Sequence, residues 1–381
     1  MRIIVIGCGK IGSTIAKDLS EALAEAEITV ADKRPETAER VASTVGGEWT
    51  TVDASDRGSI AQALRGFDLA VGALPGDYGY GAMEAAVEAG VDMVDVSYTP
   101  ENPLTLDGEA RRRGMTLIPD CGVAPGLSNM LVGYGASKLD EVREAHILVG
   151  GIPERMVPPL GYTITWSAEG LIDEYVRPVH IVEGGRVLEV PALSGLEEVE
   201  FPGLGRLEAF YTDGLRTLID TFRGVESMYE KTLRYPGHVE RVRLLRELGL
   251  FDEEPIEVDG VEVSPKLFTA RLLERHLRMP EVGDLLAMMV EVKGVKAGEG
   301  RTIRFHLLDR YDRVRGVTAM ARTTGYTASI VAQLLAKGRV EERGVVPPER
   351  LGLRPQVFEE ILMELRRRGV EVVEQVDEAG G

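Results

Sequence analysis

The sequence has few of the residues that bind transition metals or form disulfides. Among its 381 residues are two cysteines, Cys8 and Cys121, and five histidines. No Cys-x-x-Cys pair and no His-Glu-x-x-His spacing occurs, so we expect neither a disulfide framework nor a bound metal. The chain also has only two asparagines and four glutamines. A scarcity of these heat-labile amides is typical of proteins from thermophiles.

Positive charge and long apolar runs are also scarce. Lysine and arginine total 44 against 62 aspartates and glutamates, a formal charge of −18. This excess of acid argues against a nucleic-acid partner, because affinity for a phosphate backbone comes from basic side chains. No apolar run approaches the ~20 residues of a membrane span, and Gly7 interrupts the apolar start at residues 1–6. We therefore expect a cytoplasmic protein with no signal peptide and no membrane partner.

Hydrophobic residues make up 44% of the chain, which suits a globular enzyme, and its length predicts two domains. Over residues 1–121, short apolar runs alternate with helical periods, the pattern of a parallel sheet covered on both faces. Strands are expected at 2–6, 28–32, 48–53, 68–73, 91–95 and 115–119. Helices are expected at 10–24, from Pro35, from a cap at Ser55 to about Arg65, after the glycine-rich turn at 76–81, and at 101–113. The fold class is thus α/β, beginning with a Rossmann domain built on a doubly wound parallel sheet.

The pattern changes after Pro125. Between residues 142 and 310, apolar residues alternate with a period of two, as in 180–183 and 186–190 around a Gly-Gly turn, and in 288–293 and 301–308. Val258-Asp259-Gly260-Val261 predicts a further hairpin. Residues 122–321 are expected to form an inserted α+β domain on a largely antiparallel sheet, for substrate binding, catalysis and oligomerisation. Helical patterns at 327–337 and 355–368 predict that residues 322–381 return to the Rossmann domain.

The run from Gly7 to Gly12, Gly-Cys-Gly-Lys-Ile-Gly, follows a predicted strand and opens a predicted helix. In this context it predicts a dinucleotide site. Gly7 makes the tight turn, Gly9 lets the pyrophosphate approach the backbone, and Gly12 allows close packing of helix on strand. The first helical turn, with Lys10 and Ile11, offers free N–H groups and a positive dipole to the phosphates.

Asp32 ends the second predicted strand, twenty residues after Gly12. Its carboxylate is suited to accept a hydrogen bond from a ribose 2′-hydroxyl and would repel a 2′-phosphate, so NAD is the expected cofactor. The adjacent Lys33 and Arg34 soften that discrimination. Two further positions are expected on the cofactor: Asp53 toward the adenine, where a turn role is equally plausible, and Leu74-Pro75 toward the phosphates and nicotinamide. Ser97, after the fifth strand, is expected to contact the nicotinamide or the substrate.

Four segments beyond the dinucleotide motif resemble the saccharopine dehydrogenase-like family. They are Asp120-Cys121-Gly122-Val123-Ala124-Pro125-Gly126-Leu127-Ser128, Tyr211-Thr212-Asp213-Gly214, Lys231-Thr232-Leu233-Arg234-Tyr235-Pro236-Gly237-His238, and Thr324-Gly325-Tyr326-Thr327-Ala328. Together with the Rossmann segment they span most of the chain. Within the family, the resemblance is greatest to members that dehydrogenate L-lysine at C6. The resemblance implies a Rossmann domain interrupted by a catalytic domain.

The family moves a hydride between nicotinamide and a carbon that bears an amine, so the site needs an anchor for the amino acid and a route for the ammonium proton. Arg234 resembles the family arginine that holds the substrate α-carboxylate, a task that suits a guanidinium fork. His238 is the expected proton carrier, because an imidazole titrates near neutral pH. A surface ion pair for Arg234 and a structural role for His238 are the alternatives.

The remaining candidates are polar or aromatic residues near these motifs. The expected catalytic set is His238, Arg234, Tyr211 and Lys231, and the expected substrate contacts are Arg234, Tyr235, Thr212, Trp166, Ser97 and Cys121. Tyr326 is also placed to close on substrate or nicotinamide, although burial in the core is the commoner fate of an aromatic ring.

Cys121 has two interpretations. A thiol near nicotinamide suits thioester chemistry, as in semialdehyde dehydrogenases. No histidine lies near it in the sequence, however, and the family resemblance makes this stretch a pocket wall. We favour a small hydrophobic role.

The resemblance implies NAD-dependent oxidative deamination of L-lysine at its ε-amine, with the semialdehyde product cyclising to 1-piperideine-6-carboxylate. The alternatives are a saccharopine reductase or dehydrogenase, whose substrate has more carboxylates and needs more cations than Lys231, Arg234 and Arg322, or another amine-forming amino-acid dehydrogenase. An NAD-binding sensor without turnover is a third class. The expected partner is a small amino acid, and exposed strands in the second domain suggest a homo-oligomer, a dimer or higher.

Overall fold

The computed structural model describes residues 1–378, which form two compact units. The first unit contains Met1–Asp140, Arg216–Thr221 and Met320–Val372. The second contains Glu141–Leu215, Phe222–Ala319 and the chain from Val373. The first unit therefore extends beyond the expected boundary at residue 121. It also includes a short segment, 216–221, that interrupts the sequence of the second unit.

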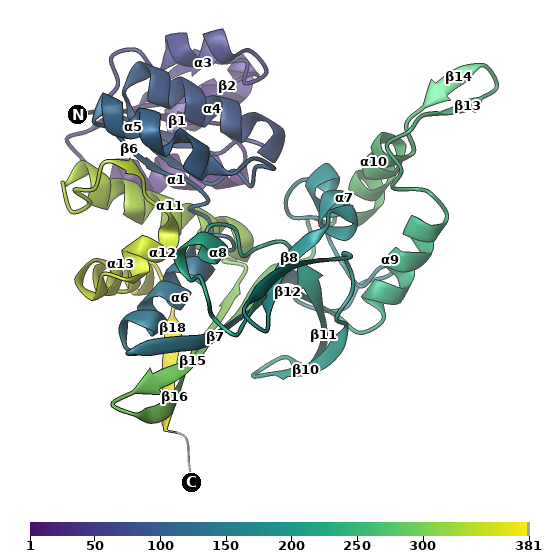
Figure 1. Cartoon of the computed structure of the whole chain (residues 1–381). Coiled ribbons are helices and arrows are strands. Elements are labelled where there is room, and N and C mark those ends of the chain that lie inside the picture. The colour runs from purple at the N-terminus through teal and green to yellow at the C-terminus, as the bar shows by residue number, and fades with distance from the viewer. Residues whose placement is uncertain (379–381) are drawn as a thin grey trace. The chain divides into compact units, whose positions relative to one another are not determined.

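The first unit is built on a parallel sheet (Figure 1). Its strands in the described residues are β1 (Arg2–Ile6), β2 (Glu27–Asp32), β3 (Glu48–Thr51), β4 (Leu69–Gly72), β5 (Asp92–Asp95), β6 (Thr116–Ile118) and β17 (Gly344–Val345). Their order is β17-β6-β5-β4-β1-β2-β3. The chain order reverses between β1 and β4, which confirms the doubly wound α/β fold. The six expected strands are present, and β17 is an addition from the C-terminal segment that the sequence pattern missed.

Helices cover both faces of this sheet (Figure 1). They are α1 (Lys10–Ala22), α2 (Pro35–Val45), α3 (Arg57–Ala63), α4 (Gly76–Ala89), α5 (Asp107–Arg113) with the 3-10 turn η1 (Pro103–Leu106), and α6 (Leu127–Ser137). Alanines and aliphatic residues of α3, α4 and α5 pack on β1, β4, β5 and β6 in one buried cluster. The expected cap at Ser55 is wrong. Asp56 caps α3, because its side chain accepts the Gly58 N–H at 2.9 Å, and Ser55 instead closes a turn with Asp53.

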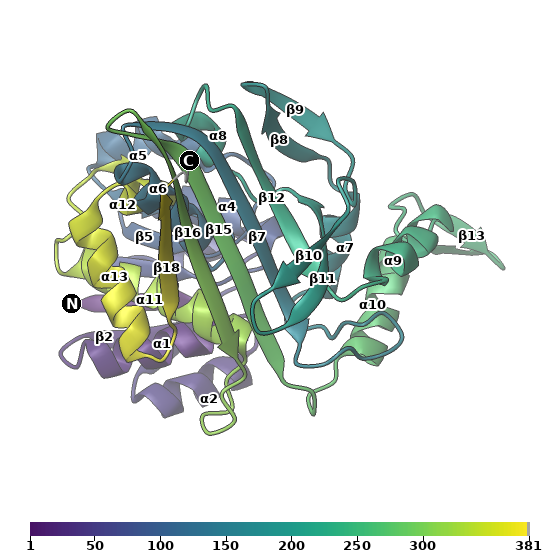
Figure 2. The ribbon, with the colours of Figure 1, turned by 90° about the horizontal axis from the view of Figure 1, so that it is seen from below.

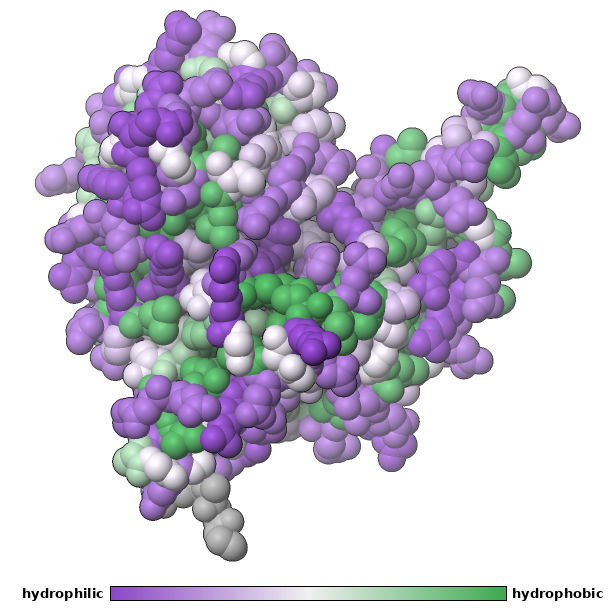
Figure 3. Space-filling view, viewed as in Figure 1, coloured by the Kyte–Doolittle hydropathy of each residue, from purple (hydrophilic) through white to green (hydrophobic). Residues whose placement is uncertain are grey.

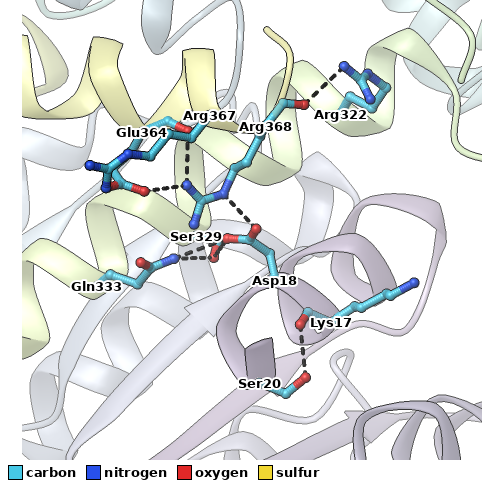
Figure 4. A network of polar contacts seen from close by, with 9 residues as sticks. All are labelled: Lys17, Asp18, Ser20, Arg322, Ser329, Gln333, Glu364, Arg367 and Arg368. Atoms are coloured by element: carbon cyan, nitrogen blue, oxygen red, sulfur yellow. Dashed lines mark hydrogen bonds and ion pairs between the residues drawn. The ribbon is translucent and has the colours of Figure 1, made fainter. Parts of the chain in front are cut away.

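The C-terminal helices belong to the first unit. They are α11 (Ala319–Ala336), α12 (Pro348–Gly352) and α13 (Pro355–Arg367), with only Ala319 of α11 assigned to the second unit. Hydrogen bonds to Asp18 connect these helices to α1 (Figure 4). Asp18 accepts from Ser329 at 2.6 Å, from Gln333 at 3.0 Å and from Arg368 at 2.6 Å. A buried carboxylate with three donors holds residues more than 300 positions apart in the chain.

The second unit is built on a mixed sheet (Figure 2). Its described strands are β7 (Glu141–Pro153), β8 (Val179–Glu183), β9 (Arg186–Val190), β10 (Glu197–Phe201), β11 (Gly205–Thr212), β12 (Ser227–Arg234), β15 (Asp284–Lys296), β16 (Glu299–Arg310) and β18 (Val372–Glu378). The main order is β10-β11-β12-β7-β15-β16-β18, with β8 and β9 attached to β12. The expected antiparallel character is correct for most pairs, but β12 and β7 run parallel. The sequence pattern also missed β18.

Short helices and a hairpin complete this unit. α7 (Ala168–Val176), α9 (His238–Glu247) and α10 (Pro265–Leu277) surround a core that includes Tyr162, Tyr175 and Phe210. The predicted hairpin is present as β13 (Ile256–Val258) and β14 (Val261–Val263), and both strands expose apolar side chains (Figure 3). α8 (Leu218–Thr221) belongs to the first unit. No helix among residues 1–378 is long and apolar enough to cross a membrane.

Candidate functional site

The loop from Gly7 to Gly12 forms an open cradle at the end of β1. Gly7 has φ +101°, and a Cβ on Gly7 would overlap the Ala73 carbonyl. A Cβ on Gly12 would overlap the Gly7 carbonyl oxygen, whereas no atom of the described chain lies within 4 Å of a Cβ on Gly9. Gly9 is the N-cap of α1, which has no side-chain cap and no acidic residue in its first turn. The helix N-terminus thus offers unneutralised N–H groups to a phosphate, so the residues present fit a dinucleotide.

Asp32 is held by two backbone donors beside this cradle. Its Oδ2 accepts the Cys8 N–H at 2.9 Å, and its Oδ1 accepts the Arg34 N–H at 3.0 Å. Each carboxylate oxygen keeps a second lone pair for a ribose hydroxyl. The Arg34 guanidinium lies 3.7 Å from Oδ1 and is largely exposed. An exposed guanidinium at this place suits a 2′-phosphate, so Asp32 and Arg34 have opposite preferences between NAD and NADP.

Asp53 forms a turn rather than an open acceptor site. Its Oδ1 accepts the Ser55 N–H at 3.0 Å and the Ser55 hydroxyl at 2.6 Å, and its Oδ2 lies 3.1 Å from Lys33 Nζ. The hydrogen bonds from Ser55, together with Lys33, lower the pKa of Asp53 to about 2. The turn role considered from the sequence is therefore present, and Lys33 is engaged by Asp53.

A second group of polar atoms lies where β4 and β5 end. Pro75 is the N-cap of α4 just after Leu74 and β4, and Asp95 ends β5. The buried Ser97 donates its N–H to Asp95 Oδ1 at 2.7 Å. Within residues 1–378, Asp95 Oδ2 and Ser97 Oγ have no hydrogen-bond partner of acceptable geometry, and burial raises the pKa of Asp95 to about 7. Ligands bind doubly wound sheets at the carboxyl ends of the strands. Asp95 is therefore a candidate that the sequence reading missed, although its position at a strand end was a usable signal.

Asp120 and Cys121 come shortly after β6, at the same edge of the sheet. Asp120 is buried with φ +50° and forms an ion pair with Arg216 at 3.1 Å. Cys121 is fully buried, its N–H donates to the Asp95 carbonyl at 2.7 Å, and burial raises the pKa of its thiol. A buried thiol that resists ionisation is a poor nucleophile, which supports the small hydrophobic role.

The segment 216–221 brings Arg216 into the first unit. Next to the arginine, Thr217 and Thr221 donate their hydroxyls to Glu349 at 3.0 and 2.6 Å. Glu349 is fully buried, and this burial raises its pKa to about 7. Arg216 was not predicted, because its partner Asp120 lies 96 residues earlier in the chain.

In the second unit, one face of β11 and β12 carries a row of polar side chains. Cross-strand partners in this antiparallel pair share a face, and side chains alternate along each strand. The register pairs Thr212 with Glu230 and Glu208 with Arg234. These four residues and Thr232, whose hydroxyl lies 3.0 Å from that of Thr212, form what we call the polar row. Each of the five is buried.

Arg234 is the cation of the polar row. Its Nη2 donates to both carboxylate oxygens of Glu174 at 3.0 and 3.1 Å, and the guanidinium lies over the Tyr162 ring. The side chain is only 3% exposed, which excludes an ordinary surface ion pair. Among the described residues its Nε has no hydrogen-bond partner. A buried donor without a partner is costly, and it marks a place where a ligand acceptor would fit.

His238 is not placed as a proton carrier, in contrast to the prediction from the sequence. Its Nε2 is 2.8 Å from the Tyr175 hydroxyl and its Nδ1 is 2.8 Å from the Leu160 carbonyl. Burial, followed by the charge of Arg234, lowers its pKa to about 3. The expectation that this imidazole titrates near neutral pH is therefore wrong, because burial disfavours the protonated, charged form of the ring. The structure gives His238 the satisfied structural role considered as its alternative.

Lys231 and Tyr211 lie on the opposite face of β11 and β12 from the polar row. Lys231 Nζ donates to the Gly195 carbonyl at 2.8 Å and to Glu197 at 2.7 Å, and it lies over the Tyr211 ring. Of the expected catalytic set, Tyr211 and Lys231 thus lie on one face of the sheet, Arg234 lies on the other, and His238 begins α9. The prediction that Lys231 and Arg234 act together is therefore wrong, because side chains alternate along a strand and residues three positions apart point to opposite faces.

Three other expected contacts are engaged locally. Tyr235 donates its hydroxyl to the Pro153 carbonyl at 2.9 Å, and Trp166 Nε1 donates to the Tyr162 hydroxyl at 3.1 Å. Tyr326 is buried on α11 near Arg322. Arg322 donates to the carbonyls of Arg368 and Gly369, both at 3.2 Å, so it holds the C-terminal helix end (Figure 4).

Glu230 is the residue of the polar row that the sequence reading did not single out. It is 5% exposed, and its Oε2 has no hydrogen-bond partner among residues 1–378. Burial, with the charges of Glu174 and Asp213, raises its pKa to about 8. The polar row and Glu174 thus contain three carboxyl groups and one guanidinium. This excess of acidic over basic groups is suited to a ligand with more amines than carboxylates.

Residues 3–118 match the saccharopine dehydrogenase NADP binding domain, and residues 122–370 match the saccharopine dehydrogenase C-terminal domain. The second match alone covers more than half of the chain. The chain therefore belongs to the saccharopine dehydrogenase family of oxidoreductases, which confirms the family resemblance.

Individual relatives are distant in sequence. The saccharopine dehydrogenase (NADP(+), L-glutamate-forming) of Saccharomyces cerevisiae is 20% identical, with 96% of each chain covered. The solved apo structure of histidine-tagged saccharopine dehydrogenase (L-Glu forming) from that yeast has a TM-score of 0.80 at 18% identity and covers 99% of both chains. The homospermidine synthase of Legionella pneumophila in complex with NAD has a TM-score of 0.66 at 13% identity and covers 99% of this chain and 91% of that one. At these identities the structural likenesses establish the fold. They leave the choice between NAD and NADP undecided.

Proposed function

We propose that the protein is an NAD-dependent dehydrogenase that oxidises L-lysine at its ε-amine. The observation that carries the proposal is the buried Nε–H of Arg234, which has no hydrogen-bond partner among residues 1–378 and lies on a sheet face that carries the hydroxyls and carboxyl groups of the polar row together with Phe210. One donor of this kind suits the single α-carboxylate of lysine. The surrounding carboxyl groups suit its two amines.

The first unit supplies the cofactor site. The N-terminus of α1 holds the pyrophosphate, and Asp32 accepts a hydrogen bond from the adenosine ribose, which favours NAD. When bound, the nicotinamide accepts a hydride from the carbon that bears the amine. The resulting imine hydrolyses with release of ammonia, and the semialdehyde cyclises with its own α-amine to 1-piperideine-6-carboxylate.

Charge balance favours lysine over saccharopine. Saccharopine has three carboxylates, which require several cations, whereas lysine has one carboxylate and two amines. Of the three cations considered from the sequence, Lys231 lies on the opposite sheet face, Arg322 is engaged by carbonyl groups, and Arg234 alone belongs to the polar row. Binding three carboxylates beside Glu174 and Glu230 would bring like charges together in a buried site.

Saccharopine dehydrogenation is the second candidate, because the yeast relative of that name aligns over 96% of this chain. Absorbance of NADH or NADPH at alkaline pH separates the two, with lysine, ornithine, saccharopine and other amino acids tested singly. Reduction of NAD with lysine alone is the expected result. Turnover that requires saccharopine transfers the function to the second candidate. Tight dinucleotide binding without turnover on any amino acid contradicts both.

A further inference from the structure

The carboxyl group of Glu230 occupies a space that the fold leaves for it. A Cβ on Gly214 would overlap that carboxyl group, so glycine in the Thr212-Asp213-Gly214 turn makes room for it. The residue is only 5% exposed, yet its Oε2 has no hydrogen-bond partner among the described residues. A buried carboxyl oxygen without a hydrogen-bond partner is costly to a folded protein, and it indicates a place for a polar ligand.

The groups that face Glu230 carry negative charge or none. Glu174 on α7 and Asp213 after β11 both act on its carboxyl group through their charge. Thr212 and Thr232 direct their hydroxyls at one another. The guanidinium nearby, that of Arg234, is engaged by Glu174 at 3.0 Å. Beside these two negative charges, the ligand group that suits Glu230 is a cation.

We infer that Glu230 receives the ε-ammonium group of lysine and takes one proton from it. The inference rests on the proposed function for the identity of the amino acid. Glu230 is then a catalytic residue, because it contacts the nitrogen next to the reacting carbon. It replaces His238, whose ring nitrogens are both occupied.

The separation of Glu230 and Arg234 along β12 is comparable with the length of an extended lysine. Glu230 and Arg234 lie on the same face four residues apart, which places their backbones about 13 Å from each other. An extended lysine separates its carboxylate from its ε-ammonium by about 7 Å. Both side chains project from the same face of the strand, and an ion-pair contact of about 3 Å at each end of lysine gives a span of the same order as this separation. Lysine with its carboxylate at Arg234 Nε thus presents its ε-ammonium to Glu230.

The proton transfer balances and suits the chemistry. Only a neutral amine can assist departure of the hydride from C6. In the step, the ε-ammonium N–H bond breaks, an O–H bond forms on the Glu230 carboxylate, and the amine keeps the electron pair. With a pKa raised to about 8, Glu230 is a stronger base than an ordinary glutamate. The same shift keeps Glu230 protonated in the free protein near pH 7, so binding of the ammonium displaces a proton to solvent.

Calorimetric titration of the whole protein tests this without relying on turnover. The ligands are L-lysine and L-norleucine, which lacks the ε-amine, and NADH is present at saturation to prevent reaction. Each titration is repeated in two buffers of different ionisation enthalpy to count released protons. The variants are Glu230→Gln, which mimics the protonated side chain in shape, and Glu226→Gln, which changes an exposed carboxylate just before β12.

Wild type and Glu226→Gln should prefer lysine to norleucine and release about one proton per lysine at pH 7. Glu230→Gln should weaken lysine binding by roughly 10- to 100-fold, leave norleucine and NADH binding unchanged, and abolish the proton release. Equal lysine preference and proton release in wild type and Glu230→Gln overturn the inference, as does a wild type that ignores the ε-amine. A wild type that prefers lysine through Glu230 but never reduces NAD supports the inference and contradicts the proposed function.

Discussion

The two units build their candidate sites from different parts of the chain. In the first unit the cradle is backbone: three glycines and the free N–H groups of α1, positioned by contacts with Ala73 and with each other. In the second unit the polar row consists of side chains whose partners are distant in sequence. Arg234 meets Glu174 60 residues earlier, and His238 meets Leu160 78 residues earlier. The first site is therefore sensitive to added atoms, and the second to changes of charge.

The largest expected effect comes from adding a methyl group to the cradle. Gly12→Ala places a Cβ against the Gly7 carbonyl, which forces α1 away from β1 and costs about 1–3 kcal/mol or more. Dinucleotide binding should be lost, as measured by quenching of protein fluorescence on titration with NADH.

Gly9→Ala tests the same cradle without disturbing the fold, because its Cβ meets no atom of residues 1–378 within 4 Å. It should leave the melting temperature unchanged while weakening NADH binding by at least about tenfold, or about 1.4 kcal/mol, since the methyl occupies the place of the pyrophosphate. Gly81→Ala, which also points into open space, is the matched control and should bind normally. Normal binding by Gly9→Ala contradicts the cradle.

The second largest effect on stability and substrate binding is expected from substitution of Arg234. Arg234→Met leaves the partly buried Glu174 without its cation, which destabilises the fold by up to about 3–5 kcal/mol. Arg234→Lys keeps the charge but loses the bidentate geometry, so the protein should fold while KM for lysine rises by about tenfold or more. Denaturant unfolding and steady-state kinetics measure the two effects. An unchanged KM in a folded Arg234→Lys protein would mean that the substrate carboxylate binds elsewhere.

The pH dependence of stability distinguishes Glu230 from an ordinary carboxylate. Its pKa in the folded protein, about 8, lies above its usual 4.5. Glu230 therefore costs stability progressively as pH rises from about 4.5 to about 8, because the unfolded chain ionises first. Glu230→Gln should be more stable than wild type at pH 9 by a few kcal/mol, at about 1.36 kcal/mol per pKa unit, and equally stable near pH 4. Chemical denaturation at both pH values measures the difference, and a pH-independent gap would refute it.

The smallest effect is expected for Cys121→Ala. The thiol is fully buried and its pKa is raised, so the substitution removes one sulfur atom from the core and no reactive group. Stability should fall by about 1 kcal/mol, and most activity should remain. Complete loss of turnover with normal NADH binding would show that the thiol takes part in the chemistry.

The same division explains how far the sequence alone could be interpreted. The Rossmann sheet, the glycine loop and Asp32 follow from short-range patterns, because each strand, turn and helix start is encoded within a few residues. β17 and β18 were missed because short strands at sheet edges have little periodicity of their own. The face to which Lys231 and Arg234 point depends on the register of β12. The hydrogen-bond partners of His238 are residues 160 and 175, and no pattern in the sequence near His238 predicts them.

A crystal structure of the protein with NADH and L-lysine tests the central claim most directly. The account predicts lysine extended along the polar row, with its carboxylate accepting a hydrogen bond from Arg234 Nε and its ε-ammonium against Glu230 Oε2. Lysine bound on the opposite face of β12, beside Lys231 and Tyr211, would contradict it. So would lysine in the reverse orientation, with its α-carboxylate facing Glu230.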